Sequence, residues 1–181
     1  MENVIIRQEK ETDHNEVFSL TELAFRSLEI SDHTEQFLVE RLRKSDAFIP
    51  ELSLVAEMDN KIVGHILLTK LIIRTDNAEI PSLSLAPISV HPDFQRKGIG
   101  GMLINKAHSI AKELGCESVI VVGHPDYYPR FGYRKASEFG ISFPFDAPDD
   151  ACMAMELSEN ALKNANGVVE YPKEFGEQNH I

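Results

Sequence analysis

The sequence has few cysteines, and this shortage limits the kinds of site it can form. Its two cysteines, Cys116 and Cys152, do not have the paired spacing of metal ligands. A single disulfide between them stays open, but reduced and buried thiols fit their apolar neighbourhoods better. No cluster of histidines and cysteines indicates a metal site, so we expect no metal.

Long apolar runs are also lacking. The most apolar window, residues 62–73, is interrupted by a glycine, a histidine, a threonine and a lysine. It therefore falls short of the roughly 20 apolar residues that a membrane-spanning helix needs. Residues 1–11 alternate charged and apolar side chains and do not resemble a secretion signal. We expect a cytoplasmic protein that does not enter a membrane.

Basic residues are outnumbered, because 18 lysines and arginines face 29 aspartates and glutamates, for a formal net charge of −11. Nucleic-acid binding needs clustered basic side chains that contact phosphates, so this balance argues against it. An acidic protein suits a cationic partner such as an amine, although solubility explains the acidity equally well.

The 181 residues, of which 43% are hydrophobic, are enough to bury one sizeable core, so we expect one domain. No internal repeat or low-complexity linker divides the chain before its last 15 or so residues. Hydrophobic periodicity and turn residues predict the order of elements. The expected elements are a strand at 5–7, two helices beginning near 13 and 32, a hairpin of 52–58 and 61–73, a strand at 83–90, a helix at 98–114, a strand at 118–122, and short strands near 133–135, 140–143 and 151–157.

Two helix starts carry the spacing of a capping box. Asp13 is followed three residues later by Glu16, and Asp32 by Glu35. In a capping box each side chain accepts a hydrogen bond from the backbone of the other residue, so the pattern predicts a helix beginning at each aspartate.

The middle of the chain predicts a strand–helix–strand unit. Strands 83–90 and 118–122 flank the helix at 98–114, so we expect them to be parallel neighbours. Pro87 lies inside the first of them and cannot donate a ladder hydrogen bond, which predicts a bulge there. The other strands are expected to be antiparallel, giving a mixed α/β sheet with helices on both faces.

The segment from Val90 to Gly101 carries the strongest chemical signal. It runs from a strand into a helix, where unpaired N–H groups and the positive end of the helix dipole attract anions. Glycines at 98, 100 and 101 let an anion approach the backbone, and Arg96 and Lys97 add positive charge. A loop with capping glycines and solvated basic residues explains this composition equally well. Taken alone, the residues indicate a phosphate site and no particular cofactor.

Two motifs extend this interpretation by resemblance. Gln95-x-x-Gly98-x-Gly100, after Val90-His91-Pro92, resembles the acetyl-CoA motif of the GNAT superfamily of N-acetyltransferases. Tyr127-Tyr128-Pro129-Arg130-Phe131-Gly132-Tyr133 is similar to the aromatic element that follows the fifth strand of that family. The longer segment 121–132 resembles the bacterial YhbS-like branch in particular.

This resemblance implies a GNAT-like fold for residues 1–157, with residues 158–181 as a polar C-terminal extension packed on the domain or trailing from it. It implies direct transfer of an acetyl group from acetyl-CoA to a primary amine of a small molecule or protein, by a monomer or homodimer. The alternative is a non-catalytic acyl-CoA-binding module that regulates or contacts other proteins.

The family motif assigns the cofactor contacts by position. Backbone N–H groups of the Gln95–Gly100 segment are expected to hold the pyrophosphate, and those of Ile88 and Val90 to pair with the pantetheine arm like an added strand. The expected cofactor-binding residues are Ile88, Val90, Gln95, Arg96, Lys97, Gly98, Ile99 and Gly100.

The resemblance also implies catalytic roles. Tyr128 occupies the position of the general acid that protonates the departing thiolate. His124 is the candidate base, although a turn residue before Pro125 explains it equally well. Asp126 and Glu35 are weaker candidates for the base, and transfer of the amine proton to water stays open. Apart from the resemblance, the loops at 27–34, at Asp126 and at 143–149 are expected to contact the acceptor, because they are the least constrained segments.

Overall fold

The computed structural model describes residues 3–176, in which nine strands form one sheet. The sheet order is β1-β2-β3-β4-β5-β8-β6, while β9 pairs with β3 and β7 pairs with β9. Only the pairs β4–β5 and β7–β9 are parallel among the pairs described. The strands are β1 Ile5–Gln8, β2 Phe48–Met58, β3 Lys61–Arg74, β4 Glu79–Val90, β5 Ser118–Val122, β6 Arg134–Lys135, β7 Ile141–Ser142, β8 Cys152–Glu156 and β9 Gly167–Glu170.

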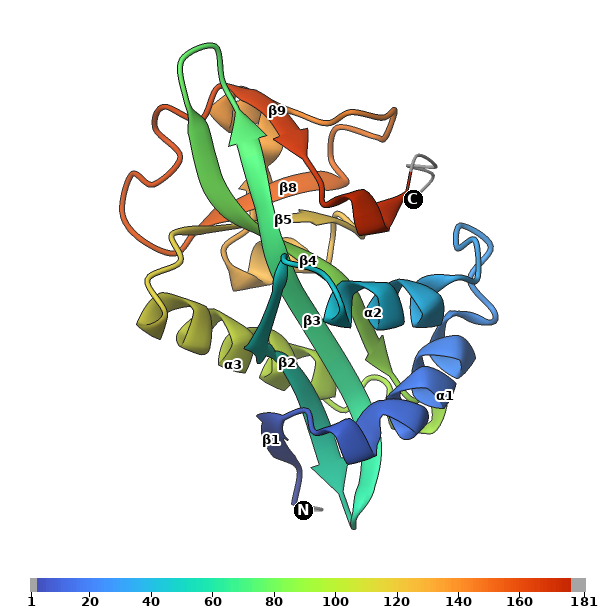
Figure 1. The fold of residues 1–181 in the computed structure, drawn as a ribbon. Coiled ribbons are helices and arrows are strands. Elements are labelled where there is room, and N and C mark those ends of the chain that lie inside the picture. Colours follow the sequence, from blue (N-terminus) through green and yellow to red (C-terminus); the bar gives the residue numbers. More distant parts are fainter. Residues whose placement is uncertain (1–2, 177–181) are drawn as a thin grey trace.

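Helices cover both faces of the sheet, as the sequence predicts (Figure 1). Helix α3 (Ile99–Glu113) packs on one face, where its Leu103 and Ile104 join a core with Ile66 and Leu68 of β3. Helices α1 (His14–Phe25) and α2 (Glu35–Arg43) pack on the other face. Because β3 is buried on both faces, its sequence is almost continuously apolar. No helix in the described part of the chain is long and apolar enough to cross a membrane.

The parallel pair β4–β5 is short, and this opens the middle of the sheet. Its pairing is confined to Leu83 with Val119 and Ser84 with Ile120. Beyond that point β4 has a bulge, because residues 86 and 87 together face a single residue of β3. The bulge predicted at Pro87 is therefore confirmed, and the Ala86–Pro87 peptide bond is cis. After the bulge β4 stays paired with β3 alone.

Tight turns behave as their residue types predict. Asp59 and Asn60 both have positive φ angles, 49° and 61°, and join β2 to β3 in a two-residue hairpin turn. Asparagine and aspartate tolerate this left-handed backbone better than most side chains.

The helix start predicted at Asp13 is confirmed, because Asp13 directly precedes α1, but the capping-box hydrogen bonds are absent, because the acidic residues have other partners. Asp13 accepts hydrogen bonds from the Lys10 N–H, at 2.8 Å, and from Arg7, and Glu16 accepts one from the Ile62 N–H, at 2.8 Å. A nearby guanidinium and the backbone of a strand outcompete the local cap.

The second helix begins later than its aspartate suggests. Thr34 is the residue that precedes α2, and Asp32 instead accepts hydrogen bonds from the backbone and hydroxyl of Thr34, at 2.9 and 2.6 Å. Glu35, now the first helical residue, accepts a hydrogen bond from the Ser31 hydroxyl. The acidic side chains shape the turn before the helix rather than capping it.

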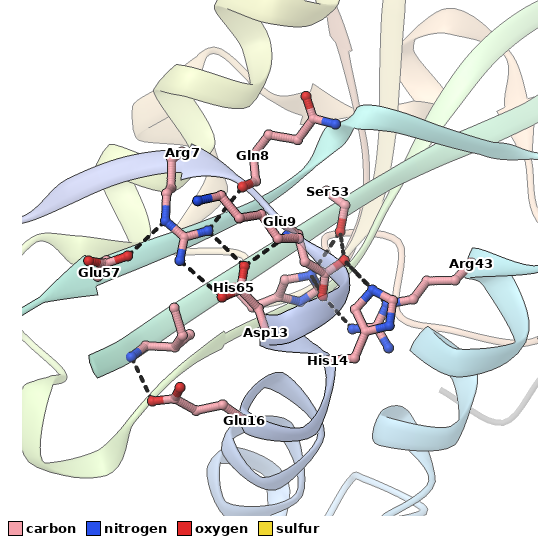
Figure 2. A network of polar contacts seen from close by, with 12 residues as sticks. Arg7, Gln8, Glu9, Asp13, His14, Glu16, Arg43, Ser53, Glu57 and His65 are labelled. Atoms are coloured by element: carbon pink, nitrogen blue, oxygen red, sulfur yellow. Dashed lines mark hydrogen bonds and ion pairs between the residues drawn. The ribbon is translucent and has the colours of Figure 1, made fainter. Parts of the chain in front are cut away.

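A buried polar network ties the N-terminal strand to the sheet and to α2 (Figure 2). The Glu9 carboxylate is paired with Arg43 of α2 and accepts a hydrogen bond from the Ser53 hydroxyl at 2.7 Å. His65 of β3 is fully buried beside it, with Nε2 3.7 Å from a Glu9 oxygen and 3.1 Å from the Ser53 hydroxyl. Burial raises the pKa of Glu9, but Arg43 and the other polar partners outweigh it and hold that pKa below its ordinary value.

The last described residues return across the sheet to α2. Strand β9 pairs with the end of β3, where Val169 is buried opposite Ile73. Tyr171 and Phe175 follow, with ring centroids 4.9 Å apart. Arg41 of α2 donates a hydrogen bond to the Glu174 carbonyl at 3.0 Å, which fixes this segment beside the helix.

Candidate functional site

The turn from β4 into α3 has the geometry of an anion site. Gly98 precedes the helix with a φ of 84°, and Arg96 also has a positive φ of 62°. A side chain at position 98 would strain this left-handed backbone, so glycine is favoured there. Helix α3 then begins at Ile99, and the N–H groups of its first turn have no partner within the helix.

A cleft of about 610 Å³ lies at this end of α3 and gathers most of the predicted cofactor residues. Lys97 is the exception, because its ammonium lies over the Phe94 ring, 5.0 Å from the centroid. Arg130, to which the sequence analysis gives no role, also lines the cleft. The predicted residues that line it are Ile88, Val90, Gln95, Arg96, Gly98, Ile99 and Gly100.

The open edge of β4 forms one wall of this cleft. The His91 N–H donates to the Val63 carbonyl of β3 at 2.9 Å. Because peptide groups alternate in direction along a strand, those of Ile88 and Val90 face away from β3, toward the side where β5 has separated. The Val90 carbonyl accepts a hydrogen bond from the Gln95 side chain at 3.1 Å.

Tyr127 crosses from the other side toward the start of α3. A Cβ atom added at Gly100 would lie 2.6 Å from the Tyr127 hydroxyl oxygen, so a larger residue there would displace this hydroxyl. Arg130 stacks on the Tyr127 ring, 4.7 Å from its centroid, and donates to the Tyr127 carbonyl at 3.0 Å. Arg130 could have been found from the sequence, because it is the basic residue within the aromatic motif Tyr127–Tyr133.

Tyr128 is buried between two other tyrosine rings. Its ring centroid lies 5.2 Å from that of Tyr127 and 5.5 Å from that of Tyr133. A Cβ on Gly123 would come within 2.3 Å of the Tyr128 ring, so the glycine at the end of β5 makes the seat for this side chain. Burial, followed by the neighbouring Tyr127, raises the pKa of Tyr128 well above its ordinary value. The phenol is therefore protonated at neutral pH.

A second cavity, of about 370 Å³, opens on the opposite side of the separated strands. Ile88 and Tyr127 line both this pocket and the cleft at α3, and Tyr128 lines the pocket. Its walls come from the loop before α2, from β4 and β5, from Phe145, and from the C-terminal segment with Tyr171 and Phe175. Most of its lining side chains are apolar.

The candidate bases lie at this pocket in different settings. The His124 side chain is 71% exposed, and its Nδ1 accepts a hydrogen bond from the Asp126 N–H at 3.2 Å. Glu35 lies at the start of α2 and also lines the pocket. Its Oε1 accepts the bond from Ser31, whereas its buried Oε2 has no partner among residues 3–176.

The fold is that of an acetyltransferase domain. Residues 5–136 match the family model described as an acetyltransferase (GNAT) domain, which covers more than half of the chain. The chain therefore belongs to the GNAT family, as its two motifs predict.

Relatives of known sequence or structure agree with this assignment. The uncharacterized N-acetyltransferase YjhQ of Escherichia coli K12 is 33% identical over 148 residues, which are 80% of this chain and 81% of YjhQ. A GNAT family acetyltransferase from Brucella melitensis, solved with acetyl-CoA, is 30% identical with a TM-score of 0.80, covering 97% of this chain and all of that one. YhbS from Escherichia coli, solved with CoA, shares the fold with a TM-score of 0.85 at 24% identity, over 97% of this chain and 93% of YhbS.

Proposed function

We propose that this protein transfers an acetyl group from acetyl-CoA directly to a primary amine. The observation that carries the proposal is the meeting of two cavities at Ile88 and Tyr127, one suited to an anionic cofactor and the other to an acceptor. The acetyl-CoA complex of the Brucella relative supports the choice of cosubstrate. The junction lies where β4 and β5 separate, so a thioester can reach the acceptor pocket from the cleft.

The cofactor contacts we propose are mainly backbone contacts. The N–H groups from Gln95 to Gly100 bind the pyrophosphate at the positive end of α3, with Arg96, Lys97 and Arg130 adding charge. The outward peptide groups of Ile88 and Val90 pair with the pantetheine arm as though it were a strand.

The transfer we propose is a single displacement. The neutral amine nitrogen attacks the thioester carbonyl carbon, a C–N bond forms, and the C–S bond breaks. The outward N–H of Val90 stabilises the oxyanion, and Tyr128 gives its proton to the departing thiolate. The raised pKa of Tyr128 keeps that proton available at neutral pH. His124, at the exposed rim of the pocket, takes the proton of the amine through water.

The cytoplasm is the compartment that we propose for this activity. Cys116 and Cys152 are both free thiols, and free thiols are typical of a reducing compartment.

Calorimetric titration with acetyl-CoA tests the cofactor site, with Gly100→Val as the control variant. The valine side chain would collide with the Tyr127 hydroxyl and fill the mouth of the anion site. We expect micromolar binding by the wild type and at least about tenfold weaker binding by the folded variant, a loss of about 1.4 kcal/mol. Wild-type protein that is folded but does not bind acetyl-CoA would overturn the proposal.

Turnover separates an enzyme from a binding module on the same fold. Free-thiol release from acetyl-CoA is followed while primary amines are supplied to the wild-type protein. Amine-dependent thiol release with formation of the acetylated amine supports the enzyme. Tight acetyl-CoA binding without transfer to any amine would instead indicate the non-catalytic module.

A further inference from the structure

We propose that the acceptor is a small primary amine carried on an aromatic group, with Glu35 binding its ammonium and the rings of Phe145, Tyr171 and Phe175 packing on its apolar part. This inference rests on the function proposed above and names the substrate class of the same site. It comes from the second cavity, whose shape, wall and charge each restrict the occupant.

The size of the pocket indicates a small molecule. Its volume of about 370 Å³ lies within the usual range for small-ligand sites, roughly 300–1,000 Å³. Its mouth carries unusually exposed apolar side chains, since Leu28 is 42% and Ile30 is 85% exposed. An apolar ligand would cover part of this surface, which is a source of binding free energy.

The wall of the pocket is aromatic and comes from outside the matched family domain, residues 5–136. Ring centroids of Phe145 and Tyr171 lie 5.9 Å apart, those of Tyr171 and Phe175 lie 4.9 Å apart, and Phe143 continues the row 5.7 Å from Phe145. Aromatic pairs prefer such spacings, so the row offers a ring-shaped ligand further stacking or edge contacts. The segments that follow the matched residues 5–136 thus favour an apolar, flat group.

The charges around the pocket leave Glu35 free for a cation. The Asp32 carboxylate accepts two hydrogen bonds from Thr34 on its Oδ1 and is exposed, so water can satisfy its other oxygen, and the Arg41 guanidinium donates to the Glu174 carbonyl. The Glu35 carboxylate has a hydrogen bond to Ser31 on one oxygen alone, and its other oxygen is buried without a donor within residues 3–176. A buried carboxylate oxygen without a donor is destabilising, and the soft last torsion of the side chain lets it turn toward an ammonium group that supplies one.

This arrangement disfavours two other kinds of amine. A polyamine would bring further ammonium groups into a mostly apolar pocket, where the single Glu35 carboxylate could not pair with all of them. A peptide would bring backbone amides into a mostly apolar pocket, where unpaired polar groups are costly. An aromatic amine has one charge and one apolar ring, which matches one carboxylate and one aromatic wall.

Binding can be measured without turnover. 2-Phenylethylamine is titrated by calorimetry into full-length protein saturated with CoA, for the wild type, Glu35→Gln and the control Glu40→Gln on the exposed face of the same helix. We expect Glu35→Gln to bind the amine about tenfold to a hundredfold more weakly and Glu40→Gln to bind it as the wild type does. The neutral analogue 2-phenylethanol should bind equally to the wild type and Glu35→Gln.

The aromatic wall is tested by Phe145→Ala with two amines. The variant should lose most of its affinity for 2-phenylethylamine and little of its affinity for ethylamine, which has no ring. Equal affinity of the wild type and Glu35→Gln for 2-phenylethylamine, or tighter binding of spermidine or a peptide than of the aromatic amine, would overturn the proposal. Failure of the proposed acetyltransferase function would give a different result: the aromatic amine would still bind in these titrations, but it would not be acetylated in the turnover assay.

Discussion

Helix α2 begins at Glu35 and ends at Arg43, and both residues have a charged group that is shielded from solvent. The two groups differ in how completely they are paired. At its last turn, Arg43 is 9% exposed and paired with Glu9, which Ser53 also contacts (Figure 2). At its first turn, the Glu35 carboxylate has one oxygen bonded to Ser31 and one buried oxygen with no partner among the described residues.

The difference separates a structural charge from one that is available for a ligand. Breaking a buried ion pair leaves an unpaired charge, which strongly destabilises a fold. A carboxylate whose oxygen lacks a donor contributes little to stability, but it can gain a partner from an incoming cation. We therefore assign the Glu9 network to the stability of the domain and Glu35 to the acceptor.

The largest expected effect is on the folded state, from Glu9→Gln. This variant removes the charge that compensates Arg43 in a buried site, so the free energy of unfolding should fall by about 3 kcal/mol. Urea denaturation measures it, with Glu57→Gln as control, because Glu57 is 23% exposed and its loss should cost under about 1 kcal/mol. If Glu9→Gln lowers the free energy of unfolding as little as Glu57→Gln does, the Glu9 network is not the structural charge pair that we contrast with Glu35.

Acidification should destabilise the protein through two buried histidines, of which His65 belongs to the Glu9 network. Burial lowers the pKa of His65 to about 4, from an ordinary value of 6.5, and burial likewise lowers the pKa of His108 to about 4. Between these values the unfolded chain binds protons that the folded chain does not. Stability should therefore be fully present above about pH 6.5 and fall toward pH 4, by up to about 1.4 kcal/mol per pH unit for each histidine.

Denaturation of a histidine variant at several pH values checks this dependence. His65→Asn should have a shallower slope of unfolding free energy against pH than the wild type, whatever its stability at neutral pH. His124→Asn is the control, since this side chain is 71% exposed. An unchanged slope in His65→Asn would contradict the claim that buried His65 contributes to the loss of stability at low pH.

The smallest effect is expected at the other end of α2. Glu35→Gln should change the free energy of unfolding by less than about 1 kcal/mol, because the amide oxygen can keep the bond from Ser31 while an uncharged NH2 group replaces the unpaired carboxylate oxygen. Thermal and urea unfolding of the variant measure this. A loss comparable to that of Glu9→Gln would make Glu35 a structural residue and weaken its assignment to the acceptor.

The fold was largely predictable because its signals are local. Residues 98–114 have strict helical spacing and end at Gly115, and Pro87 lies at the bulge of β4. The start of α1 after Asp13 was predicted correctly, but the capping-box hydrogen bonds were wrong, because Asp13 and Glu16 contact Arg7 and Ile62, partners that no local spacing reveals. Local patterns therefore predicted the helices and strands, whereas tertiary contacts determined the hydrogen-bond partners of the polar residues at the helix ends.

The two halves of the site differ in the same way. The proposed cofactor cleft is lined mainly by the continuous segment 88–101, so its glycines and basic residues are visible in the sequence, while Tyr127, Arg130 and Phe131 complete it. The acceptor pocket joins the loop before α2 to Phe145, Tyr171 and Phe175. The loops at 27–34 and 143–149 were predicted to contact the acceptor, but Tyr171 and Phe175 have no motif of their own, so only the folded chain brings them to the pocket.

The most direct test of the proposed chemistry is the rate of acetyl transfer by Tyr128→Phe. Phenylalanine keeps the ring contacts with Tyr127 and Tyr133 and removes the proton donor alone. Thiol release with a saturating amine should give a kcat lower by roughly 10² or more, with acetyl-CoA affinity by calorimetry unchanged. A variant that transfers acetyl groups at the full rate would contradict the role of Tyr128 as the general acid.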